Sequence, residues 1–109
     1  MAFDEGHAEV MRDALGHQSG LAERKMFGGL CFLLHGNMVC GVHKDGAMFR
    51  VGKGAETAAR AIAGVRPLSF TGRPMGGMVE CDADVLGDAD RLNRLIEMSL
   101  SNAASLPRK

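Results

Sequence analysis

Three cysteines and four histidines give this 109-residue chain candidate side chains for a metal site or a nucleophile. Structural zinc sites usually place cysteine ligands two to four residues apart. Here eight residues separate Cys31 from Cys40, and forty separate Cys40 from Cys81. No two histidines have the i, i+4 spacing of a helical metal site. We therefore expect no metal and no cofactor, and cysteines that pack as small hydrophobic residues.

Catalytic motifs are equally hard to find in the chain. A cysteine nucleophile needs a base that the fold brings to it, and burial in an apolar strand disfavours the thiolate. The fifteen glycines contain no phosphate-loop or dinucleotide fingerprint. The backbone amides of the Gly52-Lys53-Gly54 tripeptide could hold an anion, but a plain strand-to-helix connection is the favoured interpretation. We expect no catalytic residues and no enzyme activity.

Composition limits the class of protein further. Thirteen basic and thirteen acidic side chains leave no net charge, so no overall field draws the domain to nucleic acid, and direct nucleic-acid binding is not expected. No apolar run approaches the roughly 20 residues of a membrane span. The N-terminus carries acids where a secretory signal carries bases. We expect one cytoplasmic domain over residues 1–109, with free thiols and no membrane contact.

Three apolar runs in the middle of the chain predict an antiparallel sheet. They span residues 30–35, 38–44 and 47–51, and Gly36-Asn37 and Asp45-Gly46 separate them as two-residue hairpin turns. The other expected strands are residues 24–27, 67–71 and 75–82, with a turn at 72–74, and the expected helices are 3–16, 55–63 and 91–105, with Asp88 as an N-cap. The fold class is α+β, with helices on a mainly antiparallel sheet in two layers.

The two predicted turns fix a register, in which Cys31 pairs with Val42 and Val42 with Phe49. Because side chains alternate along a strand, one predicted face is the core: Cys31, Leu33, Cys40, Val42, Phe49 and Val51. The second face is mixed, and its apolar residues suggest a cover by another element or a second subunit: Leu30, Phe32, Leu34, Val39, His43, Met48 and Arg50. Cys31 and Cys40 become diagonal neighbours with Cα atoms about 7–8 Å apart, which is long for a disulfide.

Four short motifs give the chain a family resemblance. They are RKMFGG at residues 24–29, FRVG at 49–52, PLSFTGRPM at 67–75 and ASLP at 104–107. In their order and spacing, the chain resembles the N-terminal domain of the TfoX/Sxy competence-regulator family. The resemblance implies an α-β(3)-α-β(2)-α fold similar to type III secretion chaperones. It also implies a role in the regulation of natural-competence genes. Full-length members of the family carry a further C-terminal helical domain, which is not expected here.

Three functions remain open from the sequence. The first is a non-enzymatic regulatory module that binds a protein partner, or a second copy of itself, through the second sheet face and nearby basic residues. The second is a small ligand- or anion-binding protein, or an enzyme, with a cleft near Arg24, Arg50 and Arg73. The third is a direct DNA-binding regulator, which the neutral charge disfavours. The candidate binding residues are Arg24, Lys25, Phe32, Arg50, Lys53 and Arg73.

Overall fold

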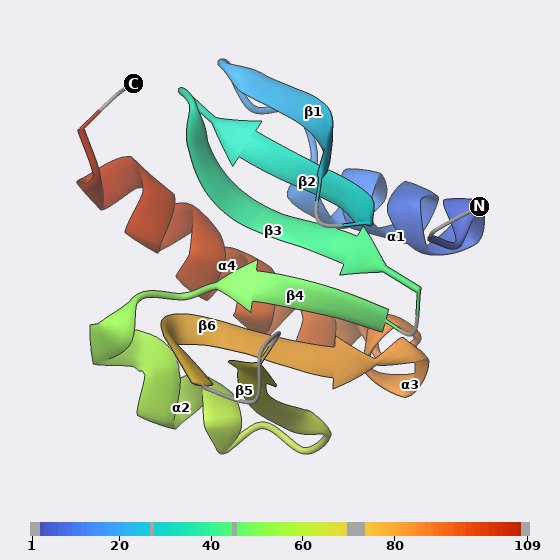
Figure 1. Ribbon diagram of the computed structural model, residues 1–109, viewed down its shortest axis with the longest axis vertical. Helices are drawn as coiled ribbons and strands as arrows, with labels where there is room; N and C mark the ends of the chain where they lie inside the picture. The colour runs from blue at the N-terminus through green and yellow to red at the C-terminus, as the bar shows by residue number, and fades with distance from the viewer. Residues whose placement is uncertain (1–2, 27, 45, 70–73, 108–109) are drawn as a thin grey trace.

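A computed structural model describes residues 3–26, 28–44, 46–69 and 74–107 of the chain (Figure 1). The first half of the chain forms α1 (Glu5–Leu15), β1 (Leu21–Met26), β2 (Gly29–Leu34), β3 (Asn37–His43) and β4 (Gly46–Arg50). The second half forms the short 3-10 helix η1 (Lys53–Ala55), α2 (Glu56–Arg60), β5 (Val65–Ser69), β6 (Pro74–Asp82), α3 (Ala83–Leu86) and α4 (Ala89–Ser105).

The described strands form a single antiparallel sheet in the order β1-β2-β3-β4-β6-β5. The long helix α4 packs on β3 and β4, while α1 packs on β3 and α3 on β4 and β6. Figure 1 shows α1 and α4 behind the sheet, and α2 beside the β5–β6 end. The α+β class and the mainly antiparallel sheet are confirmed, with four strands before α2 and two after it.

Most predicted elements coincide with observed ones. Each predicted strand overlaps an observed strand, and each long predicted helix overlaps α1 or α4. Asp88 is the N-cap of α4 and accepts a hydrogen bond from the backbone N–H of Arg91 at 3.2 Å, as expected. The one-turn helix α3 has no predicted counterpart. The predictions for residues 27, 45 and 70–73 lie outside the described residues.

A β-bulge in β3 makes the predicted pairing of β2 wrong. Phe32 pairs with Cys40 and Leu33 with Met38, so Val39 is an extra residue with no partner of its own. A bulge places two residues of one strand opposite one of the other, which reverses the alternation beyond it. Together with a first turn one residue earlier than predicted, the bulge pairs Val42 with Leu30 instead of Cys31.

The second hairpin also departs from the predicted register, because Val42 pairs with Ala47 and not with Phe49. The first hairpin turn lies one residue earlier than predicted. Leu34 pairs with Asn37, which leaves His35 and Gly36 as the turn. Both have positive φ angles, 51° and 85°, as a two-residue hairpin turn that follows the sheet twist requires. Histidine is among the few residue types other than glycine that enter this region with some frequency.

The bulge decides which apolar residues form the main core. Leu30, Phe32, Leu34 and Val39 were predicted on the second face, but all four lie in the main cluster beneath the helices. This part of the prediction is wrong because the alternation was carried through Val39. Cys40, Val42, Phe49 and Val51 do lie in the main core as predicted. Cys31 lies in a second cluster with Met48, Leu68 and Met78, against which Met26 and Met38 pack.

The chain end after α4 is held against the first hairpin. Asn37 is 3% exposed, and its side-chain amide donates to the carbonyl oxygen of Pro107 at 2.8 Å. The two residues are 70 positions apart in sequence. A buried amide needs a partner, so this contact satisfies Asn37 while it fixes the end of the described chain.

We expect Phe32→Ala to lower the free energy of unfolding by about 3–5 kcal/mol, because it opens a cavity in the main core. Arg24→Ala, on an exposed strand position of the same sheet, is the matched control and should change stability by less than about 0.5 kcal/mol. Urea unfolding followed by circular dichroism measures both. A Phe32→Ala protein as stable as the control would contradict the observed register.

Candidate functional site

The predicted basic residues lie apart on the sheet. Arg24 and Lys25 are exposed on β1, whereas Arg50 is half-buried at the end of β4 and Lys53 is exposed in η1. Two strands, β2 and β3, lie between β1 and β4, so Arg24 and Arg50 are separated by about 14 Å across the sheet. Arg73 lies outside the described residues. Of the three arginines of the expected cleft, Arg24, Arg50 and Arg73, the two that the structure describes are therefore not brought together.

Phe32, the sixth candidate binding residue, has no exposed surface and belongs to the main core. It pairs with Glu23 of β1 on one side and with Cys40 of β3 on the other. A partner cannot contact this ring without opening the core.

Lys53 belongs to a tight junction between β4, η1 and β6. The carbonyl oxygen of Gly77 accepts hydrogen bonds from the backbone N–H groups of Val51 and Gly52, both at 3.0 Å. The N–H of Gly77 donates to the carboxylate of Glu56 at 2.7 Å. A Cβ on Gly77 would lie only 3.1 Å from the backbone nitrogen of Lys53. This geometry gives the Gly52-Lys53-Gly54 tripeptide a structural task as the strand-to-helix connection.

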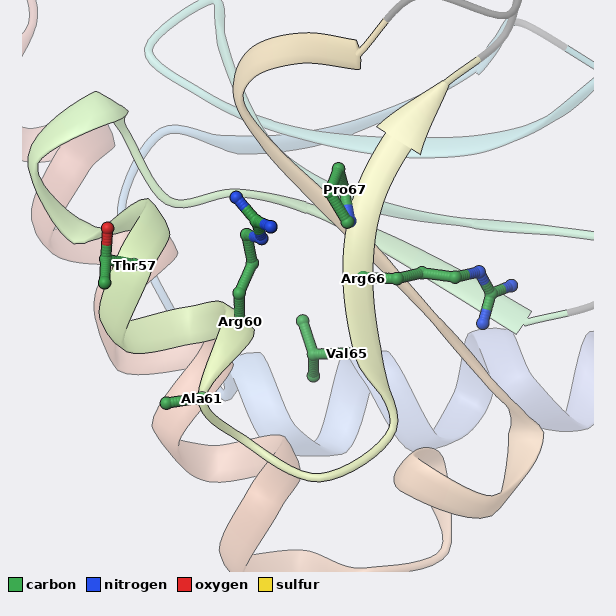
Figure 2. Close-up of a pocket in the computed structure, with 6 residues that line it drawn as sticks. All are labelled: Thr57, Arg60, Ala61, Val65, Arg66 and Pro67. Atoms are coloured by element: carbon green, nitrogen blue, oxygen red, sulfur yellow. The ribbon is translucent and has the colours of Figure 1, made fainter.

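A hollow of about 420 Å³ lies between α2 and β5. Figure 2 shows the Arg60 side chain extending along this hollow toward Pro67, while Arg66 points to the opposite side of β5. Arg66 is bound to Glu80 at 2.9 Å and to Asp82 at 3.0 Å. Only one of the two arginines that line this hollow therefore points along it, and a single exposed arginine is a weak anion site.

Polar side chains on β3, β5 and β6 form a network across the sheet. His43 Nε2 lies 3.9 Å from Glu80, which also accepts a hydrogen bond from Arg66. Arg66 holds the pKa of Asp82 below its ordinary value, mainly through their hydrogen bond. The sequence does contain a signal for this network, because Glu80 and Asp82 alternate on one face of the predicted strand. Its geometry ties β5 to β6 through ion pairs.

All three thiols are fully buried. Burial raises the pKa of Cys31 and of Cys40, and it raises the pKa of Cys81 to about 12. Cys31 and Cys40 belong to different clusters, one for each face of the sheet, so the expectation that they share the core face is wrong. A protonated, desolvated thiol is a poor nucleophile and a poor metal ligand. Among the described residues, no three histidine, cysteine, aspartate or glutamate side chains form a metal-binding group.

The edge strand β1 is the feature that sequence reasoning missed. Its four middle residues, Ala22 to Lys25, are exposed, and it pairs with β2 on one side only among the described strands. The N–H of His35 donates to the carbonyl oxygen of Gly20, so this pair is hydrogen-bonded in the ladder. In an antiparallel ladder the hydrogen-bonded positions alternate. Glu23 and Lys25 therefore turn their backbone N–H and C=O groups away from β2, toward the open edge.

Helix α1 is tied to this edge by Arg12. The Arg12 guanidinium donates to both carboxylate oxygens of Glu23, at 2.7 and 2.8 Å, and also binds Glu9. The hydrogen bond from Arg12 lowers the pKa of Glu23 and raises that of Arg12. The run of charges at residues 23–25 is the sequence signal that could have marked β1 as an edge, because edge strands commonly carry charges.

The open antiparallel sheet with helices packed on it defines a small α+β domain whose described polar groups serve packing, strand pairing and one exposed edge. The family model of the TfoX N-terminal domain matches residues 13–103. The chain belongs to this family, which supports a regulatory module of the competence-regulator type. Comparison with curated proteins and with solved structures gave no match. No helix in the described part of the chain is long and apolar enough to cross a membrane.

We expect the three thiols to react with Ellman's reagent at least about a hundredfold more slowly in the native protein than in denaturant, because labelling requires opening of the fold. Between pH 7 and 9 the buried thiols should stay protonated, because burial raises their pKa values. Labelling of the native protein should therefore still require opening of the fold at pH 9. Absorbance at 412 nm measures the rate. Immediate labelling of any thiol in the native protein would contradict the burial.

Acidification should weaken the protein through Glu23 and Asp82. Their pKa values are lowered in the fold from ordinary values of 4.5 and 3.8. The stabilisation from these ion pairs is thus fully present above about pH 5 and is lost as the pH falls through the folded pKa values. An Arg12→Met, Arg66→Met double variant should be less stable than the wild type at pH 7.

The stability gap between this double variant and the wild type should shrink at pH 3. Urea unfolding at both pH values measures the gap. The matched control is Arg94→Met, an exposed position on α4, which should show no such dependence on pH. A gap that is constant with pH would contradict the role of the two ion pairs.

Proposed function

We propose that this domain is a non-enzymatic regulatory module that binds a protein partner by adding an extended segment of the partner to β1. The observation that carries the proposal is the row of outward backbone groups at Glu23 and Lys25, on a strand that is exposed over residues 22–25. An open strand edge is a ready template for a further strand, and main-chain hydrogen bonds supply the affinity.

The opposite edge of the sheet is less suited to this task. Strand β5 contains Pro67, which has no N–H to donate. Its neighbour Arg66 is held by Glu80 and Asp82 of β6. Of the two edges in the described sheet, β1 is therefore the one that can pair along its length.

The distribution of polar groups supports protein binding over two alternatives. These are a ligand-binding protein or enzyme with an anion cleft, and a direct DNA-binding regulator. A shared anion cleft would require Arg24 and Arg50 to converge, and two strands separate them. Direct DNA binding would require a basic patch, whereas Arg12, Arg66 and Arg91 each bind carboxylates within the domain. The buried thiols and their raised pKa values offer no nucleophile to an enzyme.

We expect Lys25→Pro to abolish binding of extended peptides that are selected against the domain from a random phage-displayed library. Proline removes the outward N–H at this position and leaves the pairing of β1 with β2 intact, because that N–H takes no part in the ladder. Lys25→Ala is the matched control, since it removes the side chain but keeps the N–H.

Isothermal titration with the synthetic peptides measures binding, and urea unfolding checks that both variants fold. Hydrogen exchange should slow at the amides of Glu23 and Lys25 when a peptide binds. Peptides that bind Lys25→Pro as tightly as the wild type would place the binding site elsewhere and overturn the proposed function.

A further inference from the structure

The charges along β1 indicate what kind of segment can be added there. Glu23 is neutralised by its two hydrogen bonds from Arg12. Arg24 and Lys25 form no ion pair with any residue in the described ranges. The uncompensated charge of this edge is therefore positive, although the chain as a whole is neutral.

The two cations lie on opposite faces of the sheet. Leu21 packs against the main core and Met26 against the second cluster. Because side chains alternate, Lys25 shares the helix-covered face with Leu21 and Glu23, while Arg24 shares the other face with Met26. An incoming strand thus meets one cation on each of its own two faces, at neighbouring positions.

Resting on the proposed function, we propose that the segment added to β1 is an extended acidic peptide with two consecutive carboxylates opposite Arg24 and Lys25. The residue opposite Met26 is apolar, because Met26 is only partly buried in the second cluster. The residue opposite Glu23 is neutral, because Arg12 already holds the Glu23 carboxylate. Antiparallel addition matches the rest of the sheet and places paired side chains about 5 Å apart.

A second copy of the chain fits the edge less well. Two β1 strands related by a twofold axis pair around one central residue, since paired side chains share a face. With Arg24 at the centre, two arginines lie opposite each other. With Glu23 at the centre, Arg24 lies opposite Ala22 and Lys25 opposite Leu21, so neither cation faces a carboxylate. Like charges directly opposite each other destabilise a strand pair. An acidic partner strand avoids both arrangements.

The test uses three capped hexapeptides designed to pair antiparallel with residues 21–26. The first peptide residue lies opposite Met26 and the last opposite Leu21. The acidic probe is Val-Glu-Glu-Thr-Val-Val, and the two controls replace both glutamates with glutamine or with lysine. We expect the acidic peptide to bind about tenfold more tightly than the lysine peptide, from two exposed ion pairs. This preference should weaken as the salt concentration rises from 0.05 to 0.5 M.

A charge-reversed protein tests whether the two cations set the peptide preference, because a loss of fold or stability would not invert that preference. The Arg24→Glu, Lys25→Glu double variant should prefer the lysine peptide, with the order of the three peptides inverted. Titration calorimetry measures the affinities, and urea unfolding checks the fold. Lys25→Pro should bind none of the three peptides.

The possible outcomes distinguish the preference for an acidic segment from strand addition at β1 itself. If the three peptides bind equally, and Lys25→Pro binds none, the acidic specificity is overturned while strand addition stands. If Lys25→Pro binds the acidic peptide as well as the wild type does, strand addition at β1 fails too. If sedimentation shows a wild-type dimer that Lys25→Pro dissociates, the occupant is a second copy, and the acidic-segment proposal is overturned.

Discussion

Val39 is an extra residue in the pairing of β2 with β3, and its position fixes what each face of the sheet buries. Below the bulge Leu33 pairs with Met38, and above it Phe32 pairs with Cys40. The bulge places Cys40 and Val42 on the same face as Leu30 and Phe32, toward the helices, while Cys31 faces the methionine-rich second cluster. Helices α1 and α4 can cover the sheet because this bulge supplies a continuous apolar face.

Each face of the sheet thus buries an apolar cluster. Backbone groups remain available only at the edges of the described sheet. One edge contains Pro67 and an arginine that is held by two carboxylates. The other, β1, is fastened to α1 through Arg12 and Glu23, yet keeps its outward backbone groups exposed. The available backbone groups of the described sheet therefore lie at this edge and not on its faces.

The positions of the elements could be predicted because local chemistry decides them. Turn residues, an N-cap at Asp88 and helical or alternating apolar spacing act over a few residues, and they located the strands and the long helices. The faces of β2 could not be predicted. Nothing local at Val39 marks a bulge, because valine is an ordinary strand residue, and a displacement of one residue exchanges all the side chains between the two faces.

The sequence alone determined the α+β class, the order of the strands and long helices, the hairpin-rich sheet and the family. The first three follow from periodicity and turn chemistry, which depend on near neighbours in the chain, whereas the family follows from four short motifs. Tertiary structure alone decided that Phe32 is buried, that Arg24 and Arg50 lie apart, and that β1 is an open edge joined to α1 through Arg12 and Glu23. These depend on strand order and register, which are set by contacts between residues distant in sequence.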